Sequence, residues 1–276
     1  TDVYKGVTGT NSAPAFVTGM PVDWAIRVKP TSPNTTSFQT TTRLTNPKNL
    51  NINDNSASFS SDGGFDFQNG FLDSTYFDNT WFAWNFRRFP KVFDVVVYTG
   101  TGSSLNVTHN LNATPELIII KKTTESSYAG WAVYYGTSSN LILNKDNSTG
   151  HWYSNAVTAA SSTTFTAAAN TDVNDSTETH IALLFASLDG ISKVGTYSGT
   201  GNDVNVTGLG AAARFVMIKR TDNTGDWYVY DSTRGIVSGN DPYLLWNSTA
   251  AEVTNTDYID PHSSGFTITS SAPAAL

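Results

Sequence analysis

The chain has 276 residues, a formal net charge of −7 and no cysteine. The lack of cysteine excludes disulfides, thiol catalysis and zinc sites with cysteine ligands, and the acidic balance argues against a nucleic-acid partner, because such proteins need basic surfaces to displace counterions. Charged residues make up 14% of the sequence and aromatic residues 12%, a mixture that suits β-structure better than a helical or disordered chain.

The first third of the chain contains four candidate strands. They read "VYKGVTG" at 3–9, "PVDWAIRVK" at 21–29, "LNIN" at 50–53 and "WFAWNF" at 81–86. Short apolar or alternating runs between turn residues are typical of strands. The basic cluster "FRRFPK" at 86–91 is interpreted as a strand end with a solvated basic rim. No apolar run approaches the roughly 18 residues of a membrane helix, so we expect no membrane insertion.

The second third repeats this series of signals. "VVVYTGTGSSLNVTHNL" at 95–111 is interpreted as a hairpin with a Gly-x-Gly turn. "PELIIIKK" at 115–122 is a continuous apolar run, which is typical of a central strand covered on both faces. "GWAVYY" at 130–135, "LILN" at 141–144 and "HIALLF" at 180–185 complete the series.

Between those strands, the alanine-rich stretch 156–173 is interpreted as a loop with a short strand, because it lacks a helical stripe. The last third then repeats the signals again, with "KVGTYSGTGNDVNVTGL" at 193–209, "ARFVMIKR" at 213–220, "DWYVYD" at 226–231 and "LLWN" at 244–247. The run "FVMI" is again continuous and apolar, as expected for a central strand covered on both faces. A short helix near 231–239 is left open.

These series predict three copies of one unit of roughly 95 residues, which is the sign of a repeat architecture. Tyr4 is equated with Tyr98 and Tyr197, and "HIALLF" follows "WFAWNF" at an offset of 99 positions. The predicted fold class is all-β, with tandem antiparallel β-sandwiches of jelly-roll-like type. The copies are placed at 1–93, 94–191 and 192–276.

The third copy stops at Leu276, before its counterpart of "WFAWNF" and "HIALLF". A missing buried strand would leave an open sheet edge, which proteins normally pair or cover. We therefore expect that the strand comes from another chain or, the favoured alternative, that the protein continues past Leu276.

Catalytic and metal-binding signals are weak. The sequence has no Gly-x-Ser-x-Gly elbow. It does not exclude a glycosidase site, in which folding would bring two carboxylates together. Asp172, Asn174, Ser176 and Glu178 alternate like a calcium loop, but Thr177 stands where the sharp turn needs glycine. We interpret this segment as a turn capped by Asn and Asp side chains, and we predict no metal, no cofactor and no enzymatic activity. The four histidines occupy non-equivalent places in the copies: His109, His151, His180 and His262.

Seven tryptophans offer surfaces for stacking on sugar rings. Trp81, Trp84, Trp131 and Trp227 lie in strand patterns, so they are predicted to fill cores. Trp152 and its neighbour Tyr153, in the non-repeated stretch "GHWYSN" at 150–155, are the candidate surface contacts, with an anchoring role in the loop as the alternative.

The third copy, with "YSGTGNDVNVTGLGAAARFVMIKR" and "DWYVYDSTRG", resembles a repeated domain of unassigned function from structural proteins of tailed bacteriophages, especially marine and cyanobacterial ones. The second copy resembles the same domain. The first matches more loosely, through "TGMPVDWAIRVK" and "WFAWNFRRFPKVFDVV", and lacks the Asp-x-x-Arg-Gly motif kept at 231–235. The resemblance implies a tail-fibre-like or otherwise virion-associated protein, and it supplies no catalytic residues.

The leading hypothesis is therefore a non-enzymatic virion protein, a tail fibre or spike-type appendage involved in host attachment. The alternatives are a capsid decoration protein, and a carbohydrate-binding module or depolymerase fragment that acts on host polysaccharide. The expected partners are further copies of the chain, a trimer being one arrangement considered, other virion proteins, and a host surface glycan. The expected location is the surface of the phage particle, on the tail or the capsid exterior.

Overall fold

The computed structural model describes residues 2–34, 38–60, 64–124, 130–136, 140–146 and 156–276. Over these residues the strands form six antiparallel sheets, and the single helix in this part of the chain has four residues. This confirms the predicted all-β, sandwich-like fold class. No helix in the described ranges is long and apolar enough to cross a membrane.

The first unit has eight strands. Their bounds are β1 (Tyr4–Thr8), β2 (Phe16–Val17), β3 (Trp24–Val28), β4 (Gln39–Thr42), β5 (Lys48–Asn51), β6 (Phe59–Ser60), β7 (Gly70–Phe71) and β8 (Phe82–Phe86). Six of them form a large sheet in the order β1-β8-β3-β4-β5-β6, and β2 pairs with β7.

The second unit has eight strands and the helix. Their bounds are β9 (Phe93–Thr99), β10 (Leu105–Thr108), β11 (Leu117–Lys122), β12 (Ala132–Tyr134), β13 (Asn140–Ile142), β14 (Val157–Ala160), β15 (Thr164–Ala167), α1 (Thr171–Asn174) and β16 (Thr179–Phe185). The large sheet has the order β13-β12-β11-β16-β9, and the small sheet has the order β10-β15-β14.

The third unit has six strands. Their bounds are β17 (Val204–Val206), β18 (Phe215–Lys219), β19 (Trp227–Asp231), β20 (Leu244–Leu245), β21 (Ile259–His262) and β22 (Gly265–Ile268). They form two sheets in the orders β18-β19-β20 and β17-β22-β21. Each sheet of the molecule draws on one predicted copy, except that β9 begins one residue early, at Phe93. The copy boundaries themselves stay predictions.

The strand registers support the repeat. Trp24 of β3 lies opposite Phe86 of β8, and Leu117 of β11 lies opposite Phe185 of β16. Phe86 and Phe185 are also the residues that the offset of 99 positions aligns. The segments 21–29 and 115–122 therefore take corresponding places in their sheets.

One predicted equivalence is wrong. Tyr4 lies opposite Phe86, and the residue opposite Phe185 in the second unit is Phe93 rather than Tyr98. The sequence match of Tyr4 with Tyr98 is therefore shifted by five positions. A shared Tyr-x-Gly spelling does not fix the register, which depends on the partner strand.

The predicted hairpin at 95–111 is also wrong. β9 pairs with β16, whereas β10 pairs with β15 in the small sheet. The Gly-x-Gly turn therefore connects the two sheets of the sandwich. A hairpin and a connection between two sheets show the same alternation and the same turn residues. The reason is that alternation indicates which face of a strand is buried, not which strand it pairs with.

Two further segments differ from expectation. Residues 156–173 contain two paired strands, β14 and β15, and the start of α1 rather than a loop with one strand. Residues 231–239 form turns and a bridge instead of a helix. The Asp231 carboxylate accepts the backbone N–H groups of Thr233 and Arg234, which closes a tight turn at this point.

Each unit packs its large sheet on its small sheet around a core of its own. In the second unit this core contains Ile118 and Ile120 of β11 and Phe165 of β15. In the third unit the corresponding core contains Tyr230 of β19 and Ile268 of β22. These cores bury one face of each large sheet.

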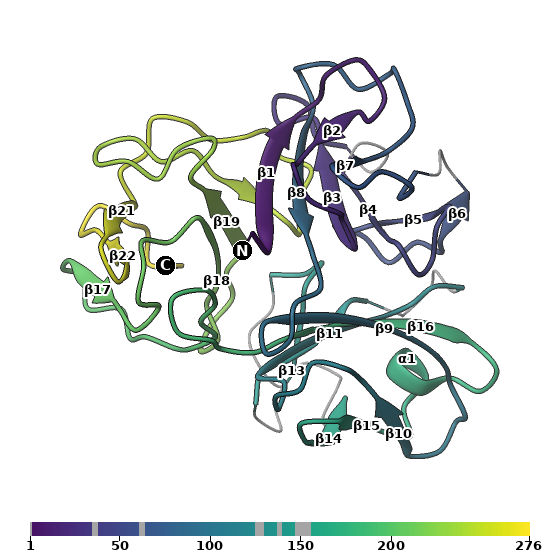
Figure 1. Cartoon of the computed structure of the whole chain (residues 1–276). Helices are drawn as coiled ribbons and strands as arrows, with labels where there is room; N and C mark the ends of the chain where they lie inside the picture. Colours follow the sequence, from purple (N-terminus) through teal and green to yellow (C-terminus); the bar gives the residue numbers. More distant parts are fainter. Residues whose placement is uncertain (1, 35–37, 61–63, 125–129, 137–139, 147–155) are drawn as a thin grey trace.

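The other faces of the three large sheets meet in one shared core. Side chains alternate along a strand, so Ile119 points into this core while its two neighbours point into the core of the second unit. Trp24 and Trp227 enter the shared core from the first and third units. Figure 1 shows the units as three lobes that meet at the centre. Burial on both faces explains why these strands are continuous apolar runs.

Candidate functional site

A buried ion pair closes the junction between the first and third units. Asp231, at the end of β19, is fully buried and accepts hydrogen bonds from the Trp84 indole at 3.0 Å and from Arg234 Nε at 2.6 Å. Arg234 also donates to Glu252 at 2.6 Å, and its guanidinium lies 5.1 Å from the centre of the Trp84 ring. Thr233 donates from its hydroxyl to the carbonyl of Gly6. Buried charges need such paired and hydrogen-bonded surroundings.

This arrangement gives the Asp-x-x-Arg-Gly motif a structural role. Both carboxylate oxygens of Asp231 are engaged, by the indole, the guanidinium and the turn N–H groups. The first unit lacks its own copy of the motif and instead contacts this one, through Trp84 and the carbonyl of Gly6. The Asp-x-x-Arg-Gly motif was noted in the sequence, but its partner was not. Trp84 lies 147 positions away from Asp231, and nothing in the sequence around Trp84 indicates that its indole donates a hydrogen bond to this motif.

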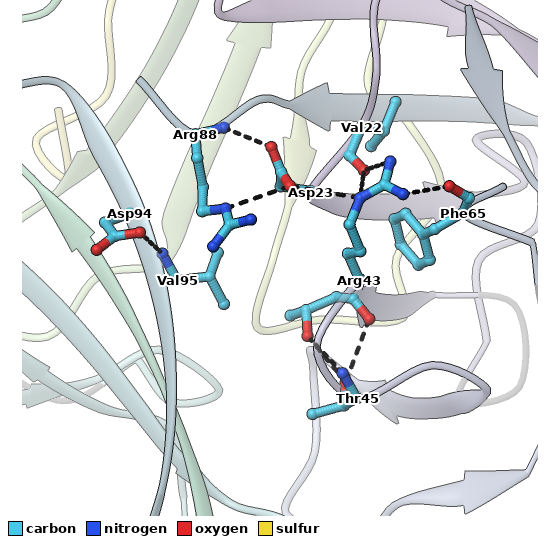
Figure 2. Close-up of polar contacts among 9 residues, drawn as sticks. Val22, Asp23, Arg43, Thr45, Phe65, Arg88, Asp94 and Val95 are labelled. Atoms are coloured by element: carbon cyan, nitrogen blue, oxygen red, sulfur yellow. Dashed lines mark hydrogen bonds and ion pairs between the residues drawn. The ribbon is translucent and has the colours of Figure 1, made fainter. Parts of the chain in front are cut away.

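A second ion cluster ties strand ends within the first unit (Figure 2). Asp23 lies between Arg43 and Arg88, with Nε-to-carboxylate distances of 3.4 and 3.3 Å. Its carboxylate also accepts the backbone N–H of Arg88 at 2.8 Å. Arg43 donates to the carbonyls of Val22 and Phe65. Arg88, from the basic cluster after β8, is thus partly neutralised at a strand end.

The second unit uses a comparable device. Glu116 accepts the backbone N–H of Ser187 at 2.6 Å, as Asp23 accepts that of Arg88. Ser187 and Arg88 are again 99 positions apart. These acidic side chains hold the chain where it leaves the central strand of each sheet.

The described histidines do not converge on one another. His180 is fully buried and stacks on Tyr98 with ring centres 5.1 Å apart. Its Nε2 accepts the N–H of Asp175 at 3.4 Å, so Nδ1 carries the proton and donates to the carbonyl of Glu178 at 3.1 Å. Burial lowers the pKa of His180 to about 4. His109 is buried elsewhere, and burial lowers its pKa too; His151 lies outside the described residues.

The segment that alternates like a calcium loop uses its side chains internally. Asn170 caps α1 by accepting the N–H of Asp172 at 2.8 Å, so the segment is a capped helical turn. The Asn174 amide accepts the N–H of Thr101 and donates to the carbonyl of Ala168. Asp175 pairs with the Lys122 ammonium at 3.0 Å. Across the described ranges, no group of three or more acidic or histidine side chains is arranged to hold a metal ion.

The candidate surface contacts, Trp152 and Tyr153, lie outside the described residues. The remaining tryptophans are buried, which confirms the predicted core role of Trp81, Trp84, Trp131 and Trp227. Besides Trp84, two of them donate hydrogen bonds between units: the Trp131 indole to the carbonyl of Asn51, and the Trp227 indole to the carbonyl of Ile142, both at 3.0 Å.

A cavity of about 980 Å³ lies between the third unit and the shared core. We call it the strand slot. Its walls are residues 213–222, which include β18, and the segment 192–202, with residues 272–276 also in the lining. Phe86 and Trp246 from the shared core line it as well. The slot is thus bounded by backbone and by large apolar side chains.

Among the described strands, β18 has a partner on one side only. It pairs with β19, whereas its counterpart β11 lies between β12 and β16. Phe215, Met217 and Lys219 are consequently half-buried, while residues 118–122 of β11 are all buried. The prediction that "FVMI" forms a central strand is therefore not met by the structure, in which β18 is an edge strand beside the slot.

Comparison with known proteins gives one match. A family model described as "Domain of unknown function (DUF7483)" matches residues 90–275, a range that contains all strands of the second and third units. No curated protein and no solved structure matches the chain. Because the match covers well over half of the sequence, the chain belongs to the DUF7483 family.

Proposed function

We propose that this chain is a non-enzymatic structural protein of a bacteriophage particle, and that it forms part of a tail fibre or spike-type appendage that takes part in host attachment. The observation that carries the proposal is the shared core, in which the large sheets of three successive units bury their inner faces against one another. Such an arrangement suits a mechanical building block.

The contacts between the units support this role. The indoles of Trp131 and Trp227 each donate to a backbone carbonyl of the preceding unit, and the Trp84 indole donates to Asp231 of the third unit. The three bonds connect every pair of units. A body of this kind gains its stability without disulfides, since the sequence has no cysteine, and it leaves loops at the surface for recognition.

The polar groups inside the described structure also support a structural role. Asp231, Asp241 and His180 are fully buried. Each is engaged by hydrogen bonds or ion pairs that hold strand ends and turns. A general acid or base must instead face a substrate.

The test is to locate the protein in purified particles of the phage that encodes it. Electron microscopy with an antibody against residues 1–276 is expected to label the tail. Label on the head would favour a capsid decoration protein, and a protein missing from the particles by mass spectrometry would overturn the proposal. Saturable binding on a glycan array that is lost in Trp152→Ala would favour a carbohydrate-binding module.

A further inference from the structure

We propose that Asp241 is a proton-dependent switch in the third unit. Its protonated side chain holds the segment 241–259 closed, and loss of the proton loosens the contact that this segment makes with the first unit. The proposal rests on the surroundings of one buried carboxyl group and on the contacts of the segment that it closes. It goes beyond the proposed function and does not depend on where the protein acts.

Asp241 joins the two ends of this segment. Its backbone N–H donates to the carbonyl of Thr256 at 2.8 Å, and the Thr256 hydroxyl donates to the carbonyl of Asp241 at 2.7 Å. Its side-chain Oδ2 accepts the backbone N–H groups of Tyr258 at 2.9 Å and of Ile259 at 3.1 Å. We call these hydrogen bonds the Asp241 clasp. Because the clasp holds both ends of the segment, it positions the residues between them.

The residues between the two ends reach the first unit. Glu252 donates from its backbone N–H to the carbonyl of Pro30 at 2.9 Å, and its carboxylate accepts a hydrogen bond from Arg234 at 2.6 Å. The carbonyl of Ser248 accepts the Asn53 amide at 3.4 Å. A change at the clasp is therefore expected to alter the junction between the third and first units.

The Asp241 carboxyl is buried without a counter-ion. The residue is fully buried, and its Oδ1 has no hydrogen-bond partner among the described residues. Asp231 is just as buried, but its carboxylate pairs with Arg234 at 2.6 Å. Arg234 is also the basic residue nearest to Asp241 in the sequence, and its guanidinium binds Asp231 and Glu252 instead. A buried charge without such a partner is costly, so the group takes up a proton.

The neighbouring acidic side chains favour the same protonated form. Burial is the main cause that raises the pKa of Asp241 from its usual 3.8 to about 6, and the charges of Asp257 and Asp260 raise it further. The two backbone N–H groups of the clasp act in the opposite direction, because they stabilise the carboxylate. Burial outweighs them.

The other titratable groups nearby are phenols. On β19 the Tyr230 hydroxyl is buried without a hydrogen-bond partner among the described residues. Burial raises the pKa of Tyr230 and the charge of Asp241 raises it further, which indicates that the two groups are close. The ring centres of Tyr230 and Tyr243 lie 5.7 Å apart, and those of Tyr243 and Tyr258 lie 5.9 Å apart. These phenols supply no positive charge for Asp241.

The hydrogen bonds indicate which oxygen carries the proton. Oδ2 of Asp241 already accepts two backbone N–H groups, whereas Oδ1 has no partner in the described part of the chain. A protonated carboxyl has one O–H donor and keeps its other oxygen as an acceptor. With the proton on Oδ1, the clasp stays intact and no buried charge is left.

Loss of this proton weakens the clasp. The O–H bond at Oδ1 breaks, water takes the proton, and the remaining carboxylate has two acidic neighbours, Asp257 and Asp260. Water must reach such a charge to stabilise it, so the ends of the segment are expected to separate. Because the folded state favours the protonated form, this contribution to stability is complete below about pH 3.8 and is lost as the pH rises through about 6.

The test follows the carboxyl group and the clasp in the whole chain. The carboxyl ¹³C shift of Asp241 is measured by NMR from about pH 4 to about pH 8. Hydrogen exchange is measured at the amides of Tyr258, Ile259 and Glu252, relative to the intrinsic rate at each pH. Asp241→Asn keeps the shape of the side chain but cannot ionise. Asp222→Asn is the control, because the Asp222 side chain is 77% exposed and pairs with Arg220.

We expect the Asp241 carboxyl to titrate with a midpoint near pH 6. Over the same range, protection of the three amides should fall about tenfold or more in the unaltered protein and in Asp222→Asn, and it should stay constant in Asp241→Asn. A midpoint below about pH 4.5, or an equal fall in Asp241→Asn, would refute the switch. If Asp241→Asn does not fold, the carboxyl titration of the unaltered protein decides by itself.

A cation is the other species that a buried carboxylate could take up. Excess calcium chloride is therefore added to the unaltered protein at the upper end of the pH range, and no recovery of amide protection is expected. Full recovery would mean that Asp241 binds a metal ion in place of a proton, and the proposal would be wrong.

Discussion

The indole N–H of Trp84 donates to the carboxylate of Asp231 at 3.0 Å, although 147 positions separate the two residues. Both side chains are fully buried. Through this bond β8 of the first unit meets β19 of the third, and Arg234 completes the contact as the counter-ion of Asp231. The bond closes the ring of three units that the indoles of Trp131 and Trp227 begin.

We predict that Trp84→Phe lowers the free energy of unfolding by roughly 2–4 kcal/mol, because it removes a buried hydrogen bond and leaves a cavity. Asp231→Asn should cost on the order of 3 kcal/mol, because it leaves the Arg234 charge without its fully buried partner. The two changes should be coupled by about 1 kcal/mol or more in a double-mutant cycle measured by denaturant unfolding.

Trp246 supplies the matched control. It is equally buried and its ring centre lies 5.9 Å from that of Trp84, but its indole nitrogen has no hydrogen-bond partner among the described residues. Trp246→Phe should destabilise by loss of packing and add to Asp231→Asn within about 0.5 kcal/mol. Equal coupling for both tryptophans would show that the indole bond to Asp231 has no special role.

We predict that the three units unfold together. The inner faces of their large sheets share one core, so no unit can unfold without exposing the apolar faces of the other two. Calorimetry should give one transition with a ratio of van't Hoff to calorimetric enthalpy near one. A fragment of residues 94–191 would expose Ile119 and Leu183 and should bind a hydrophobic dye. Separate transitions, or a stably folded fragment, would contradict a shared core.

The segments "LNIN", "LILN" and "LLWN" each end in an asparagine, and we predict different stability losses when the three asparagines are replaced. Asn144 accepts the backbone N–H of Trp131, and Asn247 accepts that of Trp227, both at 2.9 Å. Replacement by alanine should cost roughly 1–2 kcal/mol at each position, because a backbone donor loses its partner. Asn53 makes only a long contact of 3.4 Å to the carbonyl of Ser248, so Asn53→Ala should cost about 0.5 kcal/mol or less. Chemical denaturation of the three variants gives the order, and a largest effect at Asn53 would count against the assignment.

His180 should make stability depend on pH. Burial lowers its pKa from 6.5 to about 4 in the folded protein. The folded state therefore favours the neutral ring, so this contribution is complete above about pH 6.5 and is lost as the pH falls through about 4. Between pH 7 and pH 4, the free energy of unfolding should fall by roughly 2–3 kcal/mol more in the protein than in His180→Gln.

The comparison is made by denaturant unfolding at several pH values. His262→Gln is the control, because His262 is half-exposed in β21 and accepts only the N–H of Ser264. Parallel stability curves for the protein and His180→Gln would mean that His180 is not held neutral by the fold.

Much of the fold followed from local pattern. The runs at 117–122 and 215–219 become strands, as their apolar residues between turn signals predict. The offset of 99 positions places β8 and β16 in corresponding positions. Pairing was harder to predict. The alternation around Gly100 and Gly102 suits a hairpin, but β9 and β10 find their partners in different sheets. Partner choice depends on strands that lie some 60 to 90 positions further along the chain.

The all-β class, the repeated units and the lack of cysteine chemistry can be read from the amino-acid sequence, because they depend on composition and on periodicity along the chain. Packing in the folded chain produces three other features: the shared core of the large sheets, the bond from Trp84 to Asp231, and the slot beside β18. Each of those features brings together side chains from different units. These contacts depend on how whole sheets pack against one another, so no short stretch of sequence predicts them.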